Sequence, residues 1–117
     1  MKKHLCLFLG VLFAAMVPGI VFAHPPSDIK IKYDPAGKML EALIEHAVSN
    51  PQGHYIKKVD VSLNGKEILS QELSRQDNNQ TQTVKYLIPD AKAGDTLAVE
   101  AYCSISGKLE KEIKTAQ

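Results

Sequence analysis

Several short stretches between residues 28 and 114 have alternating hydrophobic and polar residues. In residues 28–33 (DIKIKY), the apolar side chains of Ile29, Ile31 and Tyr33 alternate with polar ones. Apolar residues at every second position are typical of a β-strand with one buried face. Three further stretches have a similar amphipathic pattern and are also predicted as strands: residues 81–88, 96–105 and 108–114.

Residues 39–46 (MLEALIEH) fit either a strand or a helix. As a strand, this stretch has one face formed by Leu40, Ala42, Ile44 and His46. Methionine, leucine, glutamate and alanine all favour a helix, in which Leu40, Leu43 and Ile44 would form a stripe. The connections to the neighbouring strands are short, and we therefore predict a strand.

A hairpin is predicted at Asn64-Gly65, the dipeptide that most strongly favours a two-residue β-turn. In the strand before it, Ile56 is out of phase with the residues that follow, which predicts a β-bulge at Lys57-Lys58. The strand after it spans residues 67–74, with Leu69 and Leu73 expected on the inner face. Polar or turn-forming residues predict loops at 49–53, 75–80, 89–94 and 106–107.

The sequence pattern predicts about seven short strands, with turn signals roughly every eight to twelve residues. No alternation of strands with helices and no internal repeat is present in the sequence. The pattern predicts an all-β fold, an antiparallel β-sandwich of the immunoglobulin-like type.

Residues 1–23 have the features of a signal peptide. Lys2 and Lys3 precede an apolar stretch, and Val21-Phe22-Ala23 resembles a signal peptidase site. We therefore expect an exported, periplasmic protein with one domain over residues 24–117, not held at the membrane after cleavage. The formal net charge of the whole chain is only +1, so we expect neither nucleic acid nor an anionic membrane as a partner.

The cysteine content of that domain is unusual for an exported protein. Removal of residues 1–23 takes away Cys6 and leaves Cys103 alone, whereas small exported domains normally pair their cysteines as disulfides. A buried inert thiol, an intermolecular disulfide and a metal ligand are the three interpretations.

Four side chains are candidate metal ligands: His24, His46, His54 and Cys103. By strand parity Cys103 continues the buried face of its strand, and His46 continues the face of residues 40–44. His54 opens the strand after the 49–53 loop, and His24 precedes the first strand. If these strand ends meet at one rim, nitrogen and sulfur donors converge, a set that suits iron, copper or zinc and not calcium or magnesium.

Two segments carry a family resemblance. HAVSNPQGHYIKKVDVSLNGK and, about forty residues later, AVEAYCSISGK resemble the iron-binding domain of the desulfoferrodoxin and superoxide reductase family. Members have a His-Tyr-Ile or His-Trp-Ile strand and a late Tyr-Cys-x-x-His-Gly motif. The resemblance implies an immunoglobulin-like fold and a mononuclear non-haem iron with four equatorial histidines and one axial cysteine.

The resemblance also implies ligands and an activity. Cys103 matches the axial thiolate, His54 and His46 match two of the histidines, and His24 matches the early one. The fourth histidine of the family is replaced by Ser106, so that water or Ser106 would fill that position. The implied activity is reduction of superoxide to hydrogen peroxide, with a small electron-donor protein as partner.

Two other functions remain open. In a metal-binding module without catalysis, cleavage after Ala23 would give His24 a free amine beside its own imidazole, a chelate for copper. In a partner-binding sandwich, the string HYIKKVDVSLNGK would reflect a likeness to the immunoglobulin-like subunit of the sulfur-oxidation carrier complex, which holds no metal.

Overall fold

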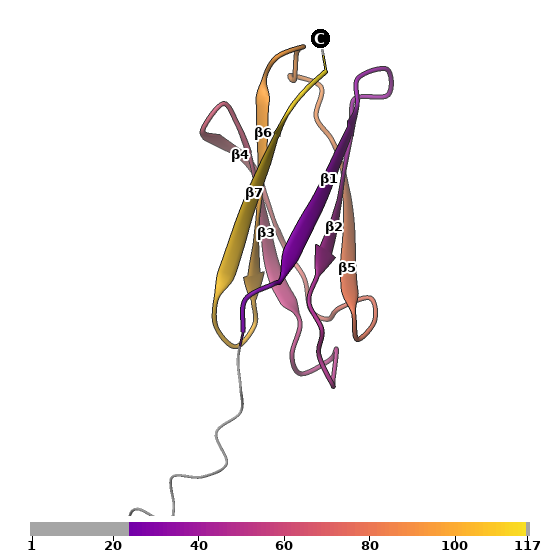
Figure 1. Ribbon diagram of the computed structural model, residues 1–117, viewed down its shortest axis with the longest axis vertical. Coiled ribbons are helices and arrows are strands. Elements are labelled where there is room, and N and C mark those ends of the chain that lie inside the picture. Colours follow the sequence, from indigo (N-terminus) through magenta and orange to yellow (C-terminus); the bar gives the residue numbers. More distant parts are fainter. Residues whose placement is uncertain (1–23, 117) are drawn as a thin grey trace, which may run out of the picture.

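The computed structural model describes residues 24–116, and the predicted signal peptide, residues 1–23, lies outside this part of the chain. Within it, no helix is long and apolar enough to span a membrane. Seven strands follow one another in the described residues (Figure 1): β1 (Asp28–Asp34), β2 (Met39–Glu45), β3 (Ile56–Leu63), β4 (Lys66–Glu72), β5 (Thr81–Leu87), β6 (Thr96–Cys103) and β7 (Lys108–Lys114).

The strands form two antiparallel sheets, one with the order β1-β2-β5 and the other with the order β4-β3-β6-β7. The sheets pack face to face, as Figure 1 shows. The predicted all-β, immunoglobulin-like sandwich is confirmed. Residues 39–45 are a strand, as expected, because they pair with β1 on one side and with β5 on the other.

The core between the sheets is built from aliphatic side chains on the inward faces of the strands. Its fully buried members include Leu40, Ala42 and Ile44 from β2, Ile56, Val59 and Val61 from β3, and Leu97, Val99 and Ala101 from β6. The partly buried Leu69 and Leu73 pack against this core, as predicted. Burial of aliphatic side chains on this scale is the main driving force for folding.

Two local features set the register of β3. At its C-terminal end, Asn64 has a φ of 51° and Gly65 a φ of 84°, the positive values that a tight hairpin with matching twist requires. At its N-terminal end, the register with β6 shifts between Ile56 and Lys58, which is the predicted bulge. Because of this bulge Ile56 faces the core opposite Cys103, and the residues just before it reach the rim of the sandwich.

Acid should destabilise this fold partly through Asp60, which lies on β3 and is only 7% exposed. Burial raises the pKa of this carboxyl, but a hydrogen bond from Ser70 and the charge of Lys58 outweigh that effect and hold it below its ordinary value. A depressed carboxyl pKa stabilises the fold above the unfolded value of about 3.9 and less as the pH falls below it. Thermal unfolding of the metal-free protein between about pH 5 and pH 2 should therefore show an acid-sensitive component of about 1–3 kcal/mol. The variant Asp60→Asn should lose that component; an unchanged acid profile would contradict the assignment.

Candidate metal centre

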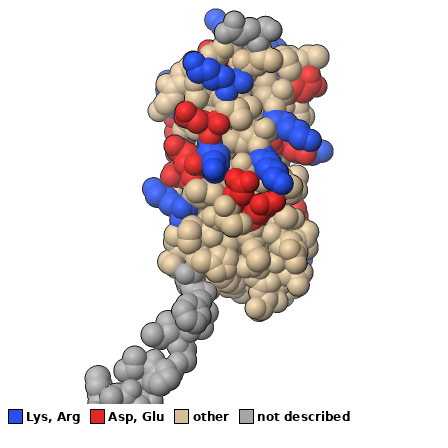
Figure 2. Space-filling model, viewed as in Figure 1, with Lys and Arg blue, Asp and Glu red and all other residues tan. Residues whose placement is uncertain are grey.

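One end of the sandwich collects side chains that are distant in sequence. His46 directly follows β2, His54 lies two residues before β3, Cys103 ends β6, and His24 precedes β1. These segments meet at the end of the domain where residue 24 enters it (Figure 1). On the face drawn in Figure 2, this lower end carries few charged side chains, whereas basic and acidic residues crowd the middle.

The three histidines form a compact cluster. One ring nitrogen from each of His24, His46 and His54 lies within 4.8 Å of the others. The ring centroids are 4.9 Å apart for His24 and His46, 5.2 Å for His24 and His54, and 4.8 Å for His46 and His54. The three predicted histidines are therefore close enough to hold one metal ion. Nitrogens on opposite sides of a metal ion lie about 4.2 Å apart and nitrogens at right angles about 3.0 Å apart, so the rings must move closer together to bind one ion.

Cys103 adjoins this cluster. Its Sγ lies 3.1 Å from Nε2 of His54, and the backbone N–H of Ile105 points at the same sulfur from 3.5 Å. A nitrogen and a sulfur bound at right angles to one metal ion are also about 3.1 Å apart. The thiol is free of any disulfide and only 2% exposed. The sulfur thus contacts one member of the cluster, His54, while the group of side chains placed to hold one ion, in the part of the chain that the structure describes, comprises only the three histidines.

Gln76 fixes the tautomer of His46. The side-chain Nε2 of Gln76 donates to the carbonyl oxygens of His46 and Asn78, at 2.8 and 2.9 Å. These two hydrogen bonds determine which end of the Gln76 amide carries the oxygen. The amide Oε1 then faces Nδ1 of His46 at 2.9 Å and can only accept, so Nδ1 carries the proton. The lone pair of His46 is therefore on Nε2, the nitrogen turned toward the cluster. Metal-binding histidines in proteins are oriented by this type of contact.

The lone pair of His46 faces an oxygen. Nε2 of His46 lies 3.3 Å from the carbonyl oxygen of His24, while His46 itself is fully buried. When Nδ1 holds the only proton of the ring, two acceptors confront each other at this distance, which is unfavourable without a cation between or beside them. A metal ion bound to Nε2 would relieve this contact.

The surroundings of His54 favour its neutral form. Burial lowers the pKa of its imidazole, and the neighbouring His46 and His24 lower it further. The neutral form of histidine is the form that binds metals.

The segment that carries His24 is fixed by contacts on both sides. The backbone N–H of Ser27 donates to the carbonyl of Glu45 at 2.8 Å, which ties the segment to the end of β2. Pro25 packs against Gly107, where an added Cβ would lie only 2.9 Å from the proline nitrogen and 3.1 Å from its Cα. Gly107 also has a φ of 90°. A glycine at this position therefore lets the segment pass close to the β6–β7 turn.

Ser106, predicted to stand near the position of a fourth histidine, is exposed on that same turn. It lines a pocket of about 340 Å³, whose other lining residues include Cys103, Tyr102 and the lysines at positions 57 and 108. Cys103 contributes to the wall of this pocket although it is only 2% exposed.

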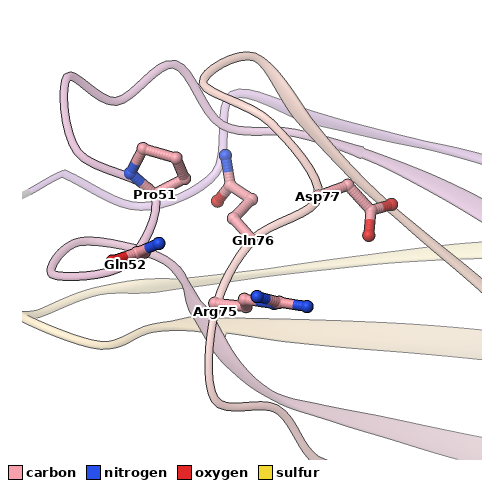
Figure 3. Close-up of a pocket in the computed structure, with 5 residues that line it drawn as sticks. All are labelled: Pro51, Gln52, Arg75, Gln76 and Asp77. Carbon is pink, nitrogen blue, oxygen red and sulfur yellow. The ribbon is translucent and has the colours of Figure 1, made fainter.

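Gln76 was not expected from the sequence, which places it in a polar loop (RQDNNQ) without any periodic signal. Yet it is only 3% exposed. A pocket of about 270 Å³ lies on its outer side, lined by Pro51, Gln52, Arg75, Gln76 and Asp77. Figure 3 shows the side chain of Gln76 directed differently from those of Arg75 and Asp77.

Replacing Gln76 with leucine should weaken metal binding by about 10–100-fold, the usual cost of losing a group that orients a ligand. The matched control is Gln82→Leu, because Gln82 is also buried in this region but bonds to Asp77 and Thr83 and not to a histidine. Competition titration with a chelator measures the metal affinity of both variants. Equal affinities for Gln76→Leu and the control would show that Gln76 has only a structural role.

Comparisons of the chain with protein-family models, with curated proteins and with solved structures found no match.

Proposed function

We propose that this protein is an exported mononuclear iron protein, with its metal held by His24, His46, His54 and Cys103. The observation that supports this most strongly is that three imidazoles from separate segments cluster at one rim, with the buried thiol of Cys103 in contact with one of them, His54. The sequence resemblance to the desulfoferrodoxin and superoxide reductase family agrees with the same four residues.

The chemistry of the donors fits such a metal. Neutral imidazole nitrogen and thiolate sulfur select iron, copper or zinc, while calcium and magnesium prefer oxygen. The Gln76 contact leaves the lone pair of His46 on the nitrogen that faces the cluster. The site is buried on its core side, where His46 and Cys103 are 0% and 2% exposed, so water has little access to the donors there.

For the reaction we propose one-electron reduction of superoxide, which takes up one electron and two protons and gives hydrogen peroxide. When bound, iron supplies the electron by cycling between its ferrous and ferric states. The thiolate of Cys103 would raise the electron density at the metal, and the imidazoles would hold it in place. A small electron-donor protein would restore the ferrous state after each turnover.

The test is reconstitution of the protein that begins at His24 with ferrous iron under anaerobic conditions, followed by oxidation. The proposal predicts one iron per chain, a visible absorption band from thiolate-to-iron(III) charge transfer, and consumption of superoxide with peroxide formed and no oxygen released. A colourless protein that leaves superoxide decay unchanged would remove the proposal.

A metal-binding module without turnover is the second candidate. Ser106, which stands in place of a fourth histidine, is exposed on the surface of the β6–β7 turn, so the proposed site has only four side-chain donors. Three nitrogens and one sulfur are also a complete ligand set for a four-coordinate zinc or copper site. The reconstitution experiment separates the two candidates, since this one predicts tight metal binding with no effect on superoxide.

A further inference from the structure

The main chain of His24, and not only its ring, lies at the metal centre. Its carbonyl oxygen is 3.3 Å from Nε2 of His46, and its ring centroid is 4.9 Å from that of His46 and 5.2 Å from that of His54. The backbone nitrogen and carbonyl oxygen of one residue are separated by only about three bonds' length. The nitrogen of His24 is therefore within a few ångströms of the cluster.

The position of this residue is preset by the chain that follows it. Pro25 and Pro26 restrict the backbone because their rings fix φ, and Pro26 is buried. Ser27 is tied to Glu45 by a backbone hydrogen bond of 2.8 Å, and Pro25 lies against Gly107. The main chain at residue 24 is thus held at the rim by a stiff segment that is anchored on both sides.

The chemical nature of the His24 nitrogen depends on processing. While Ala23 is attached, this nitrogen belongs to a peptide bond, whose lone pair is delocalised and does not bind a metal readily. Hydrolysis of the bond between Ala23 and His24 adds water, leaves a carboxylate on Ala23 and converts the nitrogen into a primary amine. That amine and Nδ1 of the same residue can close a six-membered chelate ring on a metal ion.

Pro25 favours this mode of binding. Free N-terminal segments often bind metals through the deprotonated amide of their second residue, but a proline at that position has no N–H to lose. Nδ1 of His24 already lies on the main-chain side of the ring, 3.1 Å from the carbonyl oxygen of Pro25. Exchange of that contact for a metal requires only a rotation of the exposed side chain.

We propose that the α-amino group of His24, released by removal of residues 1–23, is a fifth donor to the metal centre. The inference rests on the proposed metal-binding function and extends it. The amine supplies the donor that Ser106 does not, and metal binding then depends on processing of the chain. An unprocessed chain offers three imidazoles and one sulfur, and the processed chain offers a primary amine in addition.

The experiment compares two proteins: one that begins at His24, and one that begins at Ala23 and so keeps the peptide bond in place. The added residue is the chain's own, so the fold of residues 24–116 should be the same in both, as circular dichroism can verify. Ferrous iron is titrated anaerobically against a competing chelator. We expect the protein that begins at His24 to bind iron about 10–100-fold more tightly.

A second readout tests the amine directly. Acetylation at neutral pH followed by mass spectrometry should modify the α-amine of the metal-free protein and spare it in the iron-loaded protein. Equal, tight affinity of the two proteins, or an amine that is acetylated equally with and without iron, would overturn this inference and leave the proposed metal centre intact. Failure of both proteins to bind iron would instead refute the proposed function.

Discussion

Replacing Cys103 with serine should weaken the binding of ferrous iron by more than 100-fold and remove the visible charge-transfer band of the oxidised protein. The sulfur lies 3.1 Å from Nε2 of His54, and in the proposed centre the two share one metal ion. Loss of a group that merely orients a ligand costs about 10–100-fold in affinity, and loss of a ligand should cost more. Absorption spectroscopy and chelator competition measure the two effects.

The fold should survive this substitution. Serine is close to cysteine in size, and its oxygen can accept the N–H of Ile105 that now points at the sulfur. Ser104 provides the matched control: its hydroxyl accepts the N–H of Tyr55 at 3.1 Å, so Ser104→Ala removes a hydrogen bond next to the site without removing a donor. Unchanged iron affinity in Cys103→Ser would contradict its role as a ligand and would make the thiol structural.

Replacing Gly107 with alanine should impair both the fold and the metal centre. The added Cβ would lie 2.9 Å from the backbone nitrogen of Pro25, and the φ of 90° disfavours any residue with a side chain. Because backbone atoms cannot rotate away, the segment that carries His24 must shift. We expect iron affinity to fall at least about 10-fold, and the free energy of unfolding to fall by more than about 2 kcal/mol.

Gly65→Ala is the control that separates backbone strain at a positive φ from displacement of the segment that carries His24. Gly65 also has a positive φ, 84°, but a Cβ there would meet nothing within 4 Å. This variant should lose about 1–2 kcal/mol of stability and bind iron as the original protein does. If Gly107→Ala bound iron equally well, the contact between Pro25 and the β6–β7 turn would not position His24.

Much of the fold can be read from the sequence, because strand periodicity and turn chemistry are local signals. Alternation in residues 28–33, the Asn64-Gly65 turn and the phase break at Ile56 each predicted a feature that the structure contains. The ambiguous stretch at 39–46 is a strand because two neighbouring strands pair with it. That outcome depends on tertiary structure, which overrides the helical preference of its residues.

The candidate site was only partly predictable. Parity placed Cys103 and His46 on buried faces, and both are buried. Nothing local revealed that Gln76 turns inward from a polar loop to hold His46, or that Gly107 makes room for Pro25. Both contacts join segments far apart in the sequence, and neither glutamine nor glycine carries a periodic signal in a loop.

X-ray absorption at the iron edge tests the central claim most directly, using the iron-loaded protein that begins at His24. We expect one iron per chain with a single sulfur neighbour at about 2.3 Å, together with the outer-shell scattering of imidazole rings from histidine ligands. A first shell made only of oxygen and nitrogen, with no sulfur and no imidazole scattering, would contradict it.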